Sequence, residues 1–212
     1  RQMCIRDRFI LNNVALVVNM LELARKIQPD VFLHVSTDEV YGPAPRGYAH
    51  VEWDTILPSN PYSGSKAAQE AACVSYWRTF GVPVIITNTM NIIGERQDPE
   101  KFVPKIMYCL ENNVPMTIHG TEGNIGSRFY LHARNQADAL VYILKNLAPV
   151  AYPNADRPDR YHVVGEREID NLEMAKMVAH YWGKPLDYVL EDFHTTRPGH
   201  DLRYALDGSK LA

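Results

Sequence analysis

Apolar positions along the chain recur with a helical period in some stretches and run continuously in others. Helical spacing predicts an amphipathic helix from Phe9 to Ile27 and a second, Ala-rich helix from Tyr62 to Phe80, closed by Gly81. Short, mostly apolar runs predict two buried strands, Val31 to Val35 and Pro83 to Thr87. This alternation of strand, helix and strand is typical of an α/β protein with a parallel sheet.

Beyond Asn91 the predicted elements are shorter, and segments with a helical period alternate with segments typical of strands. We expect helices at Phe102 to Asn112, at Asn135 to Leu147, and from a cap at Asp170 or Asn171 to Trp182. Short strands are predicted at Pro115 to Gly120, Ser127 to His132, Tyr161 to Val164 and Leu186 to Leu190. Residues 43–60 form a long loop with several prolines, of a kind that often covers an active site.

The composition is that of an ordinary globular protein. Of 212 residues, 46% are hydrophobic and 22% charged, which suffices for a sizeable core in one large or two small domains. A net charge of −3 provides no basic surface for nucleic acid or an anionic membrane. No apolar run is long enough to span a bilayer, so we expect neither nucleic acid nor a membrane as a partner.

Cysteine and histidine usage bears on compartment and metal binding. The 3 cysteines, Cys4, Cys73 and Cys109, are widely spaced and odd in number, so we expect no disulfide framework and a reducing, cytoplasmic location. Cys73 and Cys109 fall in helical patterns, where small core residues are commoner than nucleophiles. The 8 histidines show no metal-ligand spacing with Cys or acidic residues, so no metal site is predicted.

Two short motifs follow the first predicted strand and open the second predicted helix. Ser36 to Gly42 reads STDEVYG, and Tyr62 to Lys66 reads YSGSK. A Tyr and a Lys four residues apart share one helix face, and a nearby ammonium lowers the pKa of a phenol, so the Tyr can act as a base. Each motif alone is common on helix surfaces or in acidic loops. Their order at the carboxyl end of a parallel strand, where ligands bind, is the informative feature.

With these motifs, the chain resembles the extended short-chain dehydrogenases/reductases of the NAD-dependent epimerase/dehydratase family, and within it the nucleotide-sugar 4,6-dehydratases. The resemblance extends from about Phe9 to Asp207. It rests also on Thr87 to Gly94 (TNTMNIIG), Pro99 to Lys101 (PEK) and Arg197 to Asp207 (RPGHDLRYALD). The triplet Thr37-Asp38-Glu39 is the part that separates dehydratases from the related epimerases and decarboxylases.

The resemblance implies removal of water from a nucleotide-bound hexose, through a transient oxidation at C4 with NAD as the cofactor. The product would be a 4-keto-6-deoxy sugar. Tyr62 would remove the proton of the 4-hydroxyl, Glu39 would take the C5 proton, and Asp38 would protonate the leaving 6-hydroxyl. Two adjacent carboxylates can play opposite roles only if their environments separate their pKa values.

The same resemblance implies the contacts that hold cofactor and substrate. Lys66 would hold the nicotinamide ribose and depress the Tyr62 pKa, while Thr37 would hydrogen-bond the 4-oxygen and the phenol. The implied cofactor-binding residues are Ser36, Tyr62 and Lys66. The implied substrate-binding residues are Asn91, Lys101, Arg128, Asn171 and Arg197. The two arginines suit a diphosphate because a guanidinium binds phosphate oxygens bidentately, whereas Asn171 is equally well a helix cap.

The chain departs from the family pattern in three ways. It has no Gly-x-x-Gly-x-x-Gly or Gly-x-Gly-x-x-Gly turn, so at ~30 residues per βαβ unit a front portion on the order of 100 residues is expected outside this chain. The acidic pair that usually follows the Arg128 position is missing. Ile92 and Ile93 stand where the family has an Asn and an aromatic. These differences leave the nucleotide and the hexose open.

We therefore expect an α/β fold: the C-terminal portion of a Rossmann-type parallel sheet with helices, plus a small interleaved α/β substrate-binding lobe. Residues 9–90 with 131–166 would form a partial dinucleotide-binding (Rossmann) domain, and residues 91–130 with 167–212 a nucleotide-sugar-binding lobe. Residues 1–8 (RQMCIRDR) fit neither part and are set aside as an artefact or a disordered end. The resemblance also implies a homodimer through the two long helices, and by itself the chain is expected to be inactive.

Two alternatives remain open at this point. A related epimerase or decarboxylase shares Tyr62 and Lys66 but has no need for Asp38 and Glu39 here. A non-catalytic sugar-nucleotide-binding module would follow if the chain is complete as given, since NAD should then bind poorly. Product analysis distinguishes a dehydratase from the first alternative, because only a dehydratase yields a 4-keto-6-deoxy sugar.

Overall fold

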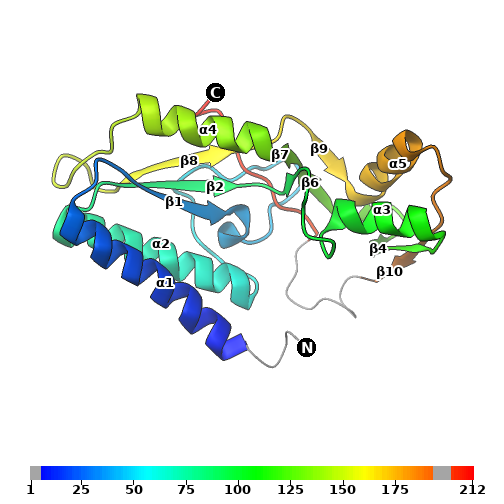
Figure 1. Ribbon diagram of the computed structural model, residues 1–212, viewed down its shortest axis with the longest axis horizontal. Helices are drawn as coiled ribbons and strands as arrows, with labels where there is room; N and C mark the ends of the chain where they lie inside the picture. The colour runs from blue at the N-terminus through cyan, green and yellow to red at the C-terminus, as the bar shows by residue number, and fades with distance from the viewer. Residues whose placement is uncertain (1–5, 193–201) are drawn as a thin grey trace.

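The computed structural model describes residues 6–192 and 202–212, which form two packed parts, each with its own small sheet (Figure 1). The larger part holds a parallel sheet in the order β1-β2-β8, formed by β1 (Phe32–Thr37), β2 (Val84–Thr89) and β8 (Asp159–Val163). Thr37 pairs with Thr89, and Thr89 pairs with Val163, so the three strands end at one edge. The parallel sheet predicted from the sequence is confirmed.

Helices cover both faces of this sheet. α1 (Arg6–Ile27) and α2 (Pro61–Phe80) lie side by side on one face, and α4 (Ala133–Asn146) lies on the other (Figure 1). Leu21, Trp77 and Ile86 are buried together between the two long helices and the sheet. α1 begins at Arg6 rather than at the expected Phe9, so it includes part of the segment that the pattern set aside. Residues 1–5 lie outside the described residues.

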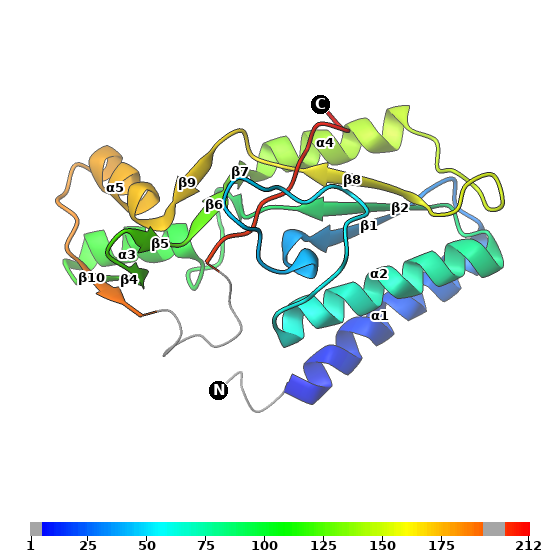
Figure 2. The ribbon, with the colours of Figure 1, turned by 180° about the vertical axis from the view of Figure 1, so that it is seen from behind.

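The smaller part packs two helices against a mixed sheet in the order β10-β4-β5 (Figure 2). Its elements are α3 (Phe102–Asn112), β4 (Met116–Thr121), β5 (Asn124–Ile125), α5 (Asn171–Trp182) and β10 (Tyr188–Glu191). Ile106, Met116, Ile118 and Ala175 are the centre of its core. α3 has the bounds that its helical spacing predicted.

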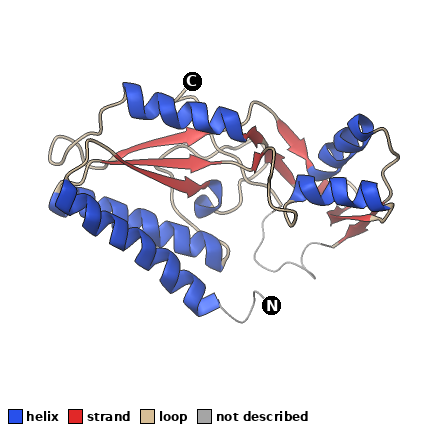
Figure 3. Ribbon diagram, in the orientation of Figure 1, coloured by secondary structure: helices blue, strands red, loops and turns tan. Residues whose placement is uncertain are grey.

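The predicted single strand from Ser127 to His132 is wrong, because this segment joins two different sheets. It divides at Tyr130 into β6 (Ser127–Phe129) and β7 (Leu131–His132). β6 pairs with β9 (Glu168–Asp170), a strand that the pattern did not predict, and β7 pairs with β3 (Ile92–Ile93). These short strands connect the two groups of helices in Figure 3. No helix in the described ranges is long and apolar enough to cross a membrane.

Candidate functional site

β1 ends at Thr37, and the chain turns at once into a short 3-10 helix, η2 (Asp38–Tyr41), which carries both predicted carboxylates. Thr37 caps this turn, because its side-chain oxygen accepts a hydrogen bond from the backbone N of Glu39 at 3.4 Å. The turn ends at Gly42, whose φ of 76° lies in the left-handed region. A Cβ there would also collide with the carbonyl of Leu57, so glycine is required.

α2, which carries the Tyr–Lys pair, begins with a capping box. Asn60 Oδ1 accepts from the backbone N of Ser63 at 3.0 Å, and Ser63 Oγ accepts from the backbone N of Asn60 at 3.2 Å. Asn60 Nδ2 also donates to Glu39 Oε2 at 3.0 Å. One residue thus starts the helix and holds the predicted general base. Sequence reasoning missed Asn60, although an Asn followed by Pro61 is a helix-start signal that could have found it.

Tyr62, Thr37 and Asp38 form a continuous hydrogen-bonded chain. The Tyr62 phenol hydrogen-bonds the Thr37 side chain, and Thr37 Oγ1 donates to Asp38 Oδ1 at 2.9 Å. The three residues come from the end of β1, the start of η2 and the first turn of α2. The structure therefore brings together three of the five predicted catalytic residues, with Glu39 tied to the same cluster through Asn60.

Asp38 has the environment of a proton donor. It is 5% exposed, and its Oδ2 is buried without a hydrogen-bond partner among residues 6–192 and 202–212. Burial and the neighbouring Glu39 charge raise the pKa of Asp38 to about 7, against smaller opposing effects of Thr37 and Arg128. A carboxyl group with this pKa is substantially protonated at neutral pH, whereas Glu39 is less buried and accepts a hydrogen bond from Asn60. The two adjacent carboxylates therefore have different surroundings.

The predicted lowering of the Tyr62 pKa is wrong for these residues by themselves. Burial and the charge of Glu39 raise the pKa of Tyr62 above its ordinary value, and the Thr37 hydrogen bond only partly offsets them. Lys66 Nζ instead donates to the carbonyl oxygen of Val35 at 2.7 Å, so its ammonium group is anchored to β1. Tyr62 therefore needs a further positive charge close by before it can act as a base near neutral pH.

Ser36 lies between Val35 and Thr37 on β1. It is 4% exposed, and its Oγ is buried with no hydrogen-bond partner among the residues that the structure describes. A buried hydroxyl normally has a partner, so an unpaired one beside a cluster of titratable groups favours a contact with a ligand.

Arg128 and Asn171 lie at the junction of the two parts. Arg128 Nη1 donates to the carbonyl oxygen of Leu202 at 2.7 Å, and its guanidinium lies 4.6 Å from the ring centroid of Tyr204. Its charge also lowers the pKa of Asp38, so it is within electrostatic reach of the acidic pair. Asn171 is not the helix cap, which is Asp170; Asn171 Oδ1 accepts from the Tyr130 hydroxyl at 2.8 Å.

The other predicted substrate-binding residues are exposed or lie outside the described residues. Asn91 is exposed between β2 and β3, and Lys101 is exposed at the N-cap of α3. Arg197 lies outside the described residues. Within the described ranges, no group of three or more His, Cys, Asp or Glu residues could hold a metal ion.

A cavity of about 550 Å³ lies apart from the Tyr62 cluster. It is lined by residues of loop 44–47, turn 123–127, β9 and the segment Leu202–Arg203. Arg203 crosses this region, with Nε donating to Glu168 Oε1 at 2.7 Å and Nη1 donating to the carbonyl oxygen of Tyr48 at 2.7 Å. None of the predicted catalytic residues lines this cavity.

Comparisons with known proteins identify the family of the chain. The profile of the NAD dependent epimerase/dehydratase family matches residues 1–155. A probable dTDP-glucose 4,6-dehydratase of Sinorhizobium fredii is 33% identical over 224 residues, which cover 97% of this chain and 60% of the relative. The chain thus spans about 60% of the length of this relative and of a dTDP-glucose 4,6-dehydratase of Actinoplanes that is 34% identical.

Solved structures show the same Rossmann-type α/β fold. The dTDP-glucose 4,6-dehydratase of Streptomyces venezuelae, solved with NAD bound, has a TM-score of 0.83 and 28% identity, covering 100% of this chain and 62% of that chain. The UDP-glucose 4-epimerase of Thermus thermophilus, solved with NAD, has a TM-score of 0.81 and 26% identity, covering 94% of this chain and 62% of that chain. The predicted fold class is confirmed.

Proposed function

The chain belongs to the NAD dependent epimerase/dehydratase family, and we propose that it carries the proton-transfer residues of a nucleotide-sugar 4,6-dehydratase. The observation that carries this proposal is Asp38, a buried carboxyl group whose pKa is raised to about 7 beside Thr37 and Tyr62. Elimination of water needs an acid that protonates the leaving hydroxyl, whereas an epimerase has no such step. A 33% identical relative named as a probable dTDP-glucose 4,6-dehydratase supports this assignment.

The residues at the end of β1 fit the nicotinamide end of NAD. Ser36 Oγ is a buried hydroxyl without a partner in the described ranges. The raised pKa of Tyr62 calls for a nearby cation, which the oxidised nicotinamide ring carries. Ser36, Tyr62 and Lys66 would hold this end, with Lys66 on the ribose. NAD held by these residues would supply the hydride acceptor for oxidation at C4 of the sugar and the hydride donor for reduction at C6. The phosphate-binding glycine turn would lie outside this chain.

Each catalytic side chain then has one task. Tyr62 takes the proton of the sugar 4-hydroxyl, and Thr37, already bonded to that phenol, hydrogen-bonds the 4-oxygen. The 4-keto group acidifies the C5 proton, which Glu39 accepts while Asn60 holds its carboxylate. Asp38 gives its proton to the departing 6-hydroxyl. The different surroundings of the two carboxylates allow these opposite roles.

Substrate binding extends from this cluster into the smaller part. Arg128 and Arg197 would bind the diphosphate, since guanidinium groups bind phosphate oxygens bidentately. Asn91, Lys101 and Asn171 complete the proposed substrate-binding set. The position of Arg128 between Leu202 and the acidic pair supports its assignment.

The division into domains is a proposal of the same kind. Residues 9–90 with 131–166 form a partial dinucleotide-binding domain, and residues 91–130 with 167–212 the nucleotide-sugar-binding lobe. β1 is the terminal strand of the order β1-β2-β8, so its edge away from β2 pairs with no strand in the described residues. We place the front of the Rossmann sheet at that edge, and for this reason the chain by itself is expected to be inactive.

We also propose a cytoplasmic homodimer. Large apolar side chains form an exposed stripe on α1 with helical spacing, which suits a helical bundle between two copies: Leu16, Met20, Leu23 and Ile27. Cys73 and Cys109 are free and buried, in keeping with a reducing compartment.

The proposed function is tested with the chain preceded by its upstream segment, NAD⁺, and dTDP-glucose or UDP-glucose as substrate. A dehydratase yields a 4-keto sugar, seen by its absorbance in alkali, together with the loss of one water by mass. A change of configuration without loss of water would overturn the proposal in favour of the second candidate, a sugar-nucleotide 4-epimerase, which the likeness to the Thermus thermophilus enzyme supports.

A further inference from the structure

A buried ion pair lies behind the candidate site and takes no part in the proposed proton transfers. Arg160 on β8 and Glu70 on α2 are each 1% exposed, and Arg160 Nη2 donates to Glu70 Oε2 at 2.7 Å. Charged side chains are almost never fully buried, and removing two charges from water often costs as much as their attraction returns. Stability alone therefore does not explain why this ion pair lies in the interior.

Glu70 connects the pair to the end of β1. Its Oε1 accepts from Asn88 Nδ2 at 2.8 Å, and the same Nδ2 donates to the carbonyl oxygen of Thr37 at 3.0 Å. Glu70 also follows Tyr62 and Lys66 at steps of four residues, so the three side chains share one face of α2. The pair is thus linked both to the strand end and to the helix face that carries the Tyr–Lys pair.

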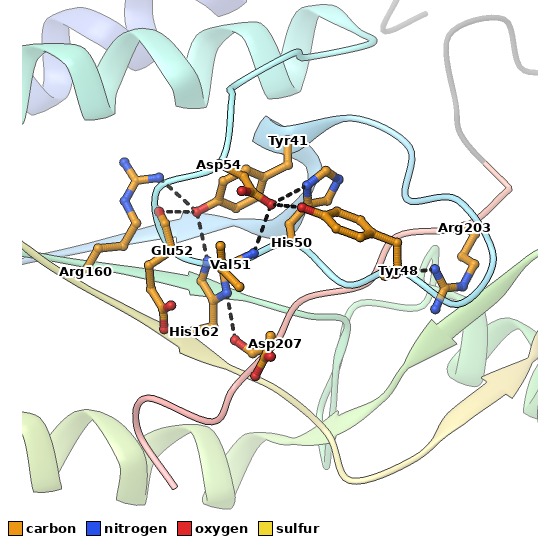
Figure 4. Close-up of polar contacts among 10 residues, drawn as sticks. All are labelled: Tyr41, Tyr48, His50, Val51, Glu52, Asp54, Arg160, His162, Arg203 and Asp207. Atoms are coloured by element: carbon orange, nitrogen blue, oxygen red, sulfur yellow. Dashed lines mark hydrogen bonds and ion pairs between the residues drawn. The ribbon is translucent and has the colours of Figure 1, made fainter.

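Arg160 connects the pair to the other end of η2. Its Nη1 donates to the hydroxyl of Tyr41 at 3.0 Å, as Figure 4 shows. The guanidinium also lies 4.2 Å from the ring centroid of Trp53, and Tyr41 donates to the carbonyl oxygen of Glu52 at 2.8 Å. Arg160 therefore holds the last residue of η2 together with the loop that follows it.

We propose that the Arg160–Glu70 pair positions the Thr37–Tyr41 segment against the Tyr62–Lys66 face of α2. Both acidic groups of the candidate site, Asp38 and Glu39, lie between the two anchors, the Thr37 carbonyl and the Tyr41 hydroxyl. Loss of the pair frees Tyr41 from Arg160 and weakens the Glu70 acceptor that orients Asn88 towards the Thr37 carbonyl, which displaces the carboxylates from Tyr62. Arg160 and Glu70 are thus positioning residues, and their effect on turnover rests on the proposed function.

Two variants separate positioning from stability in the full-length protein. Arg160→Met leaves the Glu70 carboxylate buried and unpaired, whereas Glu70→Gln with Arg160→Met removes both charges. We expect the double variant to recover the thermal midpoint that the single variant loses. Its kcat should stay low by on the order of 100-fold, with little change in KM, because misplacement by about 1 Å costs that much. Recovery of kcat together with the midpoint would overturn the proposal.

Hydrogen–deuterium exchange gives a readout that needs no turnover. Peptides that cover residues 37–41 should exchange faster in both variants than in the wild type. Arg167→Met is the matched control, because it removes an arginine from an exposed pair with Glu173 and should change neither exchange nor kcat. If the wild type makes no 4-keto sugar, the proposed function fails, and unchanged exchange at residues 37–41 would separately refute the positioning role.

Discussion

Thr37 donates its hydroxyl proton to Asp38 Oδ1 at 2.9 Å, which leaves Oδ2 as the oxygen of Asp38 that can carry a proton. That oxygen is buried and has no hydrogen-bond partner in the described part of the chain. Thr37 also bonds the Tyr62 phenol, so one hydroxyl fixes the proposed acid relative to the proposed base for C4 oxidation. The proposed chemistry depends on this arrangement of three side chains.

The elimination step should slow as the pH rises above about 7, because Asp38, whose pKa lies there, must be protonated to act. Asp38→Asn should remove this descending limb and lower kcat by about 10²–10⁴, the usual contribution of general acid catalysis. The measurement is kcat against pH with the elimination step isolated by single turnover. A kcat that does not change between pH 6 and 8 in the wild type would exclude Asp38 as the general acid.

Asp38 should also make the fold less stable at neutral pH than at acid pH. Its pKa rises from 3.8 to about 7 on folding, so the folded state favours the protonated form. The resulting penalty is absent below pH about 4, grows as pH rises, and is complete above pH about 7. Asp38→Asn should therefore stabilise the protein at pH 8 by roughly 4 kcal/mol, measured by urea unfolding. Asp138→Asn, an exposed change on α4, is the control and should have no such effect.

The sequence predicted the parts of the fold that have a strong hydrophobic periodicity or a local sequence motif. α3 and the central strands lie where the patterns placed them, since these segments bury one helix face or a whole strand. The five proposed catalytic residues come from two local motifs, and each motif is held by local caps at Thr37 and Asn60. Local rules suffice for such elements.

The rest depended on contacts between distant residues. The division at Tyr130 follows from pairing with β9 and β3, which no local pattern reveals. The raised pKa of Tyr62 reflects burial and the charge of Glu39, and Lys66 is anchored on β1 instead. The Arg160–Glu70 pair joins residues that are far apart in sequence, so neither charge could be recognised as buried.

Glu39→Gln should block loss of the C5 proton while C4 oxidation continues, because Tyr62 and Thr37 are untouched. The measurement is uptake of deuterium at C5 of the sugar nucleotide in D₂O, followed by mass spectrometry. Product formation should fall by about 10²–10⁴, the usual effect of losing a general base. Asn60→Ala, which releases the Glu39 carboxylate and removes the α2 cap but keeps the base, should give a smaller loss. Normal C5 exchange in Glu39→Gln would exclude Glu39 as the base.

Charges placed on the α1 stripe should dissociate the proposed homodimer. Met20 and Leu23 are 54% and 46% exposed, and Met20→Glu with Leu23→Glu would bury two carboxylates in an interface there. We expect at least a tenfold rise in the dimer dissociation constant, equivalent to about 1.4 kcal/mol, in sedimentation equilibrium. Leu144→Glu on α4, where the wild-type side chain is 49% exposed, is the matched control. Equal effects of both changes would argue against α1 as the interface.

Acid should destabilise the fold through two buried histidines. His34 and His162 are 6% and 1% exposed, and burial lowers their pKa values from 6.5 to about 3 and about 4. His162 Nδ1 must carry a proton because it donates to the carbonyl oxygen of Asp207 at 2.9 Å. Nε2 of the neutral ring lies 2.8 Å from the Tyr41 hydroxyl, whose single proton is shared between Nε2 and the carbonyl oxygen of Glu52.

The stability that neutral His162 provides is complete above pH 6.5 and is lost as pH falls towards about 4, since the unfolded chain binds the proton first. The contribution of His162 to the unfolding free energy should therefore fall between pH 7 and pH 4, opposite in sign to that of Asp38, and His162→Gln should remove about 3 kcal/mol of this fall. His180→Gln, on the exposed face of α5, should leave the drop unchanged. An unaltered pH dependence in His162→Gln would mean that His162 is protonated in the folded state, with its Nε2 donating to Tyr41.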